Sequence, residues 1–163
     1  MAMHDKYTNH DDTEMVLVGK LIEPYWAAHK RRTGETQAQF ARRVLNATQP
    51  FFSNILRGVD PVSLDAFGKL IHELDIPTKK VSHVLAVCPN YVAKFRAELI
   101  AVNRLVSALY PNQTKDYNSF LESDELFESV PKTARLEDCQ RRFKRRECSE
   151  DELFDAVVEM FDL

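Results

Sequence analysis

The side chains best suited to catalysis or metal binding are thinly spread in this sequence. The cysteines, Cys88, Cys139 and Cys148, form no CxxC pair, and three thiols cannot all pair within one chain. The histidines have no ligand-like spacing to them. The sequence contains no glycine-rich phosphate loop, nucleophile elbow or HExxH motif. We therefore expect no catalytic residues, no metal site and no cofactor, and we expect a reduced protein of the cytoplasm.

A different chemistry is concentrated between Thr36 and Gly58, a segment that contains several carboxamide and hydroxyl side chains together with three arginines. The surrounding segment from Lys20 to Gly58 holds seven basic and two acidic residues, a formal charge of +5. Residues 115–163 hold eight basic and fourteen acidic residues, a formal charge of −6. A basic module joined to an acidic one indicates that only the first faces phosphate.

Helices are expected to position these side chains, because apolar residues recur at three- and four-residue spacing through most of the chain. The pattern predicts an all-α fold with helices at about 15–32, 36–44, 49–57, 63–74, 78–87, 90–110, from 119, 133–146 and from 149. Pro24 should kink the first helix or start a new one. Residues 1–12 are polar and expected to be disordered. No apolar run approaches the roughly 18 residues of a membrane span, so no membrane partner is expected.

Several residues mark the ends of these helices. Thr36 with Gln39, Ser119 with Glu122 and Ser149 with Glu152 have capping-box spacing. Ser63 should cap the helix that follows it. Pro50 suits a first helical turn, and Gly34 suits the stop after the first helix.

The segment T-Q-A-Q-F-A-R-R-V-L-N-A-T-Q-P-F-F-S-N-I-L-R-G, residues 36–58, resembles the helix-turn-helix of the phage-repressor and Cro family, also called the xenobiotic-response-element family. The positions that match the family pattern are Thr36, Gln37, Phe40, Ala41, Val44, Thr48, Gln49, Phe52, Ser53, Ile55, Leu56 and Gly58. Ala41 would be the small residue where the two helices touch, within an apolar seam that includes Phe40 and Phe52. The resemblance implies a lambda-repressor-like domain in a sequence-specific DNA-binding transcription regulator, either a repressor or an activator.

Two departures from the family pattern lie at the turn. Leu45 or Asn46 stands where the family has glycine, and the connection is one residue longer. Asn46 can take the left-handed conformation that glycine usually supplies. The angle of the second helix can therefore differ from the usual one.

The resemblance makes residues 49–57 the recognition helix, which would lie in the major groove of double-stranded DNA. The base-contacting candidates are Gln49, Pro50, Phe51, Ser53 and Asn54. Gln49 can bond adenine bidentately, and an exposed Phe51 can touch a thymine methyl; packing on a neighbouring loop is the alternative for Phe51. The phosphate-contacting candidates are Gln37, Arg42, Arg43, Thr48 and Arg57. Gln37 resembles the family glutamine that binds phosphate and braces the recognition-helix glutamine, whereas the arginines alternatively form an ordinary solvated face.

The chain divides on these grounds into a disordered N-terminus (1–12), a helix-turn-helix domain (13–88), a long connecting or dimerisation helix (89–111) and an acidic helical C-terminal region (112–163). The long helix either pairs with its copy in a homodimer or covers its own core. The C-terminal region either closes a second bundle, docks on RNA polymerase or another regulatory protein, or swaps between subunits. Its cluster Arg141–Arg146 fits a mixed-charge solvent face better than a DNA contact. The main functional alternative is a protein-interaction adaptor or antitoxin-type protein on the same fold.

Overall fold

The computed structural model describes residues 12–109 and 132–161, and these ranges contain helices and no strand. The elements are α2 (Asp12–Thr33), α3 (Gln37–Phe40), η1 (Ala41–Leu45), α4 (Gln49–Leu56), α5 (Leu64–Glu73), α6 (Thr78–Ala86), α7 (Pro89–Leu109), α9 (Ala134–Lys144) and α10 (Glu150–Phe161). The all-α prediction is confirmed, with most helix ends within a few residues of those expected. The helix expected from Ser119 and the N-terminal segment 1–11 lie outside the described residues, and Asp12 already belongs to α2.

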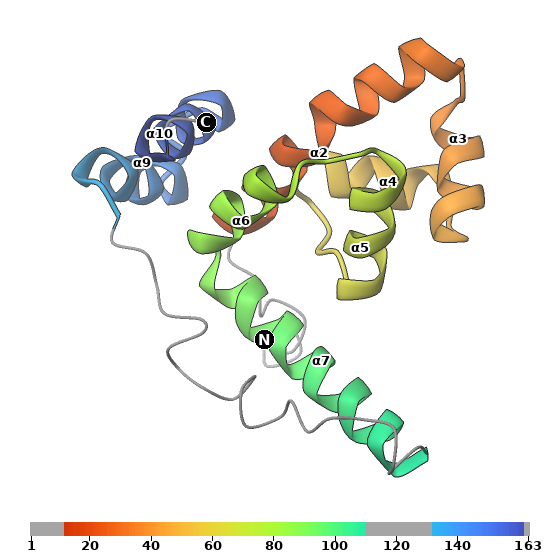
Figure 1. Cartoon of the computed structure of the whole chain (residues 1–163). Coiled ribbons are helices and arrows are strands. Elements are labelled where there is room, and N and C mark those ends of the chain that lie inside the picture. Colours follow the sequence, from red (N-terminus) through yellow and green to blue (C-terminus); the bar gives the residue numbers. More distant parts are fainter. Residues whose placement is uncertain (1–11, 110–131, 162–163) are drawn as a thin grey trace, which may run out of the picture.

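Helix α2 contacts α4, α6, α9 and α10, and it runs from beside α6 to the connection with α3 (Figure 1). Its fully buried face includes Leu17, Leu21 and Ile22. Trp26 joins Phe40 and Phe52 in an aromatic cluster, with ring centroids 4.9 Å and 5.3 Å from that of Trp26. Aromatic rings at such distances add to the stability gained by burial, so this cluster fixes α2 against α3 and α4.

Pro24 does not divide the first helix. The prediction of a new helix at this residue is wrong, because α2 continues through it to Thr33. Pro24 is exposed, and the surrounding turns are held by the buried residues Ile22 and Trp26. Packing on both sides therefore outweighs the loss of one helical hydrogen bond. Gly34 ends the helix as predicted, with φ of 72°.

Helix α2 crosses the end of α4 with almost no space between the two backbones. A Cβ added to Gly19 would lie 2.6 Å from the carbonyl oxygen of Leu56 and 2.8 Å from that of Ile55. Gly58, just after α4, has φ of 71° and an equally close approach to Val16. Only glycine fits such a contact, so the crossing is specified by two residues without side chains.

Helix α7 is divided into a buried half and an exposed half. Tyr91 and Phe95 are in the core, and the buried carboxylate of Glu14 accepts hydrogen bonds from the backbone N–H groups of Asn90 and Tyr91 at 3.2 Å and 3.0 Å. The outer half projects from the body (Figure 1). Its large apolar side chains are 40% to 63% exposed: Leu99, Val102, Leu105 and Leu109. The inner half of α7 therefore covers the core of its own chain, and the outer half has an apolar surface of the kind that pairing with a second copy would need.

Helices α9 and α10 form a hairpin that packs on α2. Leu136 and Cys139 of α9 and Leu153 and Val157 of α10 are fully buried in the same core as the residues of α2. The apolar face considered for docking on a partner is therefore largely occupied within the chain. The Arg141–Arg146 cluster has the expected mixed-charge face, because Arg142 pairs with Asp138 and Glu152 at 2.8 Å each.

Candidate nucleic-acid interface

The predicted capping box at Thr36 positions the first helix of the candidate interface. The Thr36 hydroxyl accepts a hydrogen bond from the backbone N–H of Gln39 at 3.2 Å, and the Gln39 side chain accepts one from the backbone N–H of Thr36 at 3.0 Å. Both halves of the box are thus present. They fix the start of α3 and place Gln37 in its first turn.

The extra residue in the turn is accommodated by a wider helical turn. Residues Ala41–Leu45 form a π-turn, in which the carbonyl of Ala41 accepts from the backbone N–H of Asn46 and, at 3.1 Å, from that of Ala47. Such turns enclose one more residue than an α-helical turn. Asn46 has φ of 49°, which confirms the predicted left-handed conformation. The additional residue is therefore taken up by the π-turn after α3, and the connection from Asn46 to α4 remains short.

The apolar seam between the two helices is formed as the sequence predicts. Phe40, Ala41, Val44, Phe52 and Ile55 are all buried, and Ala41 has no exposed surface. The seam fixes the rotation of α4 about its axis. The opposite side of α4 is therefore left to the solvent.

The first turn of α4 is exposed on the side opposite the buried Phe52. Thr48, Gln49, Pro50 and Phe51 are exposed, and Phe51 has 37% of its surface accessible. Thr48 is the N-cap residue, although its side chain makes no capping hydrogen bond. The side-chain amide of Gln49 donates to the Gln37 side-chain oxygen at 3.4 Å. This is the brace between α3 and α4 that the resemblance implies.

Asn54 and Arg57 are engaged within the chain at the other end of α4. The Asn54 amide donates to Asp60 at 3.1 Å, and its carbonyl oxygen accepts from the Arg57 guanidinium. The backbone carbonyl of Asn54 also accepts from the backbone N–H groups of Val59 and Asp60. Asn54 therefore organises the loop after α4 and is less available to a base than Gln49 is.

A groove of about 750 Å³ runs between α2 and α4. Three predicted site residues line it, namely Gln37, Ser53 and Arg57, together with Lys20 and Lys30 from α2. Both lysines belong to the basic segment Lys20–Gly58, but the sequence does not identify them as site residues. Their positions in α2 do not show that they lie beside α4, because that depends on the direction in which the two helices cross. The groove joins amide, hydroxyl and cationic groups on one surface.

Arg42 and Arg43 lie on a different surface, beside His29 and Glu35. Two nitrogens of the Arg43 guanidinium donate to Glu35 at 2.8 Å, and a third donates to Glu73 at 3.1 Å. The two carboxylates raise the pKa of Arg43, and the guanidinium with His29 lowers the pKa of Glu35 to about 2. Because its charge is already balanced, Arg43 is a poorer phosphate ligand than the exposed Arg42.

The acidic start of α10 borders the groove. Glu150 is among the groove-lining residues, and Asp151 pairs with Lys20 at 2.9 Å. This hydrogen-bonded contact, with Glu23, raises the pKa of Lys20. Lys20 is therefore already engaged by carboxylates, and Lys30 and Arg57 are the other cations of a groove that Glu23 and Glu150 also line.

Comparison with known proteins adds no family assignment: no protein-family model, no curated protein and no solved structure matches the chain. The resemblance to the phage-repressor family therefore stays a prediction based on the motif residues. Among the helices that the structure describes, none has the length and apolar character needed to cross a bilayer. The described side chains grouped closely enough to hold a metal ion lie at the turn between α9 and α10.

Proposed function

We propose that this protein is a sequence-specific DNA-binding transcription regulator that places α4 in the major groove of double-stranded DNA. The observation that carries the proposal is the exposed first turn of α4, held by a buried seam and braced through the Gln37–Gln49 hydrogen bond. A short helix with a buried back and an exposed N-terminal turn that begins with Gln49 fits the geometry of a recognition helix.

The side chains divide into two roles on this proposal. Gln49 and Ser53 have the groups that read base edges, and Phe51 supplies an apolar contact for a thymine methyl. Lys30, Arg42 and Arg57 are exposed cations and would bind phosphates, which positions the protein without reading sequence. The N-terminal end of α4, where the Thr48 side chain makes no capping hydrogen bond, would also favour a phosphate oxygen.

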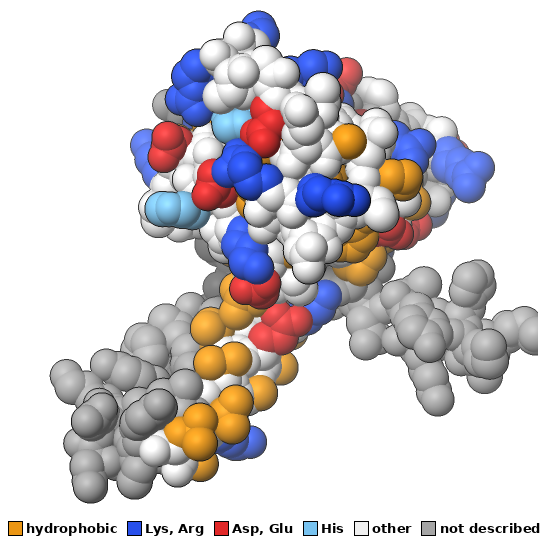
Figure 2. Space-filling view, turned by 90° about the vertical axis from the view of Figure 1, so that its right-hand side faces the viewer, with side chains coloured by type: hydrophobic (Ala, Val, Ile, Leu, Met, Phe, Trp, Pro, Cys, Tyr) orange, Lys and Arg blue, Asp and Glu red, His pale blue; other side chains and the backbone are white. Residues whose placement is uncertain are grey.

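The proposed regulator binds as a homodimer joined through the outer half of α7. Phe95, Leu99, Val102, Val106 and Leu109 follow one another at alternating spacings of four and three residues. This heptad repeat is typical of a helix that pairs with another helix along its length. Figure 2 shows hydrophobic side chains along the arm formed by this helix. A second copy offers the same stripe, so a two-fold pairing would cover both arms at once.

Selection from a random pool of double-stranded DNA with the purified full chain tests the proposal. We expect enrichment of a two-fold symmetric site that is bound at least about a thousandfold more tightly than a scrambled one. Lys30→Ala should weaken binding to both sequences, whereas Lys79→Ala, an exposed lysine on α6, should change neither.

The opposite result would also be informative. Weak binding without enrichment, lost steeply as salt rises, would indicate phosphate attraction alone and would overturn the proposal. The protein-interaction role on the same fold would then be the better hypothesis. The double variant Arg42→Ala with Gln49→Ala separates the two, because an adaptor should keep its partner when both side chains are removed.

A further inference from the structure

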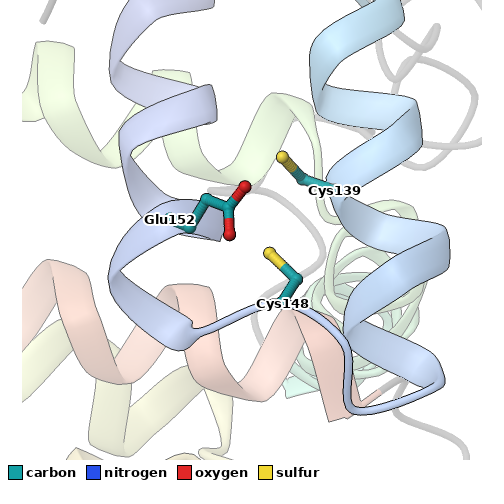
Figure 3. A group of neighbouring side chains, drawn as sticks. All are labelled: Cys139, Cys148 and Glu152. Carbon is teal, nitrogen blue, oxygen red and sulfur yellow. The ribbon is translucent and has the colours of Figure 1, made fainter.

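Two of the cysteines and one carboxylate come together at the turn between α9 and α10. Cys139 projects from α9, Cys148 from the connecting turn and Glu152 from the first turn of α10 (Figure 3). Their sulfur atoms and a carboxylate oxygen all lie within 4.8 Å of one another. The three backbone segments are held in place by the hairpin core, which includes the fully buried Leu136 and Leu153.

The donor set has the chemistry of a site for a thiophilic divalent cation such as Zn²⁺. Thiolate sulfur and carboxylate oxygen are both common ligands of this ion. In a tetrahedral site with zinc–sulfur bonds of about 2.3 Å, two sulfurs lie about 3.8 Å apart. The spacing in the hairpin is close enough for small side-chain rotations to bring all three donors onto one ion.

Arg142 provides the outer support that such a site requires. Its guanidinium lies 3.6 Å from the Cys139 sulfur and donates to Glu152 at 2.8 Å. Burial and the neighbouring Glu152 raise the pKa of the Cys148 thiol to about 11, so a bound metal ion has to displace the proton of that thiol. Two thiolates and one carboxylate around one divalent ion have a total charge of −1, and the guanidinium of Arg142, which is shared with Asp138, lies beside that charge.

We propose that Cys139, Cys148 and Glu152 form a binding site for Zn²⁺ or a cation of similar softness, with Arg142 as its outer partner and water as the fourth ligand. A water-filled fourth position follows from having three protein ligands. The site links α9 to α10 and thereby stabilises the hairpin that packs on α2. The spacing, Cys-x8-Cys-x3-Glu, is not one of the common zinc motifs, so sequence inspection alone does not find it.

Titration of the reduced full chain with Co²⁺ tests the site, because thiolate–cobalt coordination produces charge-transfer absorption that carboxylate coordination lacks. We expect saturation at one equivalent, reversal by Zn²⁺ and a higher unfolding temperature for the loaded protein. Cys148→Ser should abolish the absorption, and Glu152→Gln should weaken binding by at least about tenfold, because the loss of an outer-shell partner alone already costs about that much. Cys88→Ala, which removes a buried thiol outside the hairpin, should retain full binding.

Several outcomes would overturn the proposal. They are no stoichiometric binding, binding retained by a folded Cys148→Ser variant, or binding lost in Cys88→Ala. A Cys139–Cys148 disulfide that forms in air, with no metal bound by the reduced chain, would make the cluster a redox pair and would equally exclude the metal site. None of these readouts involves DNA, so the result is independent of the proposed regulatory function.

Discussion

At the scale of single residues, the exposed turn of α4 separates side chains that are available for recognition from those already used by the fold. Gln49 and Phe51 face the solvent, whereas Asn54 is hydrogen-bonded to Asp60. The sequence placed all three in one recognition helix, because spacing alone does not show which polar groups are already engaged. The aromatic seam was predictable, since large apolar residues at helical spacing seldom remain in water.

Gln49→Ala tests the recognition role that we propose for this residue. We expect affinity for the selected site to fall about tenfold to a hundredfold, which corresponds to one bidentate base contact. Affinity for scrambled DNA should not change, because the variant retains every cation. Fluorescence anisotropy with both duplexes measures the difference, and an equal loss on the two sequences would contradict base readout by Gln49.

Glu35 gives the fold a measurable dependence on pH. Its pKa is lowered from 4.5 to about 2, chiefly by the hydrogen-bonded Arg43 and also by His29. A carboxyl group with a depressed pKa stabilises the fold above its unfolded value, and this contribution is lost as pH falls from about 4.5 towards 2. We expect Glu35→Gln to lower the free energy of unfolding by about 1–2 kcal/mol at neutral pH, given that Arg43 is half exposed.

Chemical denaturation at several pH values measures this effect. The difference between Glu35→Gln and the parent should disappear near pH 2, the pKa of Glu35 in the folded protein. Glu137→Gln, at an exposed position on α9, serves as the control and should have little effect throughout. A constant deficit across the whole pH range would indicate a packing defect and contradict the role of the charge.

At the scale of helices, close backbone contact decides how α2 and α4 cross. Gly19→Ala should reduce the free energy of unfolding by about 1–3 kcal/mol, because the new methyl group meets two carbonyl oxygens that cannot move independently. Gly68→Ala is the matched control within α5, where an added Cβ meets nothing within 4 Å. It should stabilise the protein by about 0.5–1 kcal/mol. Thermal unfolding should show a lower unfolding temperature for Gly19→Ala and a higher one for Gly68→Ala than for the parent chain.

The helices were predictable to different degrees. Capping residues and apolar periodicity located α5, α9 and α10, and Pro50 marked the first turn of α4, because these signals are local in the sequence. The capping box expected at Ser149 is only half formed: the Ser149 hydroxyl accepts from the backbone N–H of Glu152, while the Glu152 side chain turns to Arg142. The π-turn at Ala41–Leu45 and the docking of the hairpin on α2 depend on contacts distant in sequence, so the sequence pattern did not reveal them.

At the scale of the whole molecule, the exposed stripe of α7 predicts self-association. The double variant Val102→Glu with Leu109→Glu should convert the dimer into a monomer, because it places like charges along the heptad seam. Its unfolding temperature at low protein concentration should change little, since both residues are more than half exposed in the single chain. Ala101→Glu, on the same helix but off the seam, should remain dimeric.

Sedimentation velocity distinguishes these states, and a parent chain that is monomeric at high concentration would contradict the prediction.

The division of α7 into a buried half and an exposed half also affects how the occupancy of a DNA site would depend on the amount of protein. If two chains must meet on the outer half before two copies of α4 can reach one DNA site, occupancy below the dissociation constant of the dimer follows the square of chain abundance. Halving the amount of protein then reduces the dimer about fourfold by mass action. The pairing of two exposed apolar arms would thereby make the regulator respond more steeply to its own synthesis and degradation than a single chain would.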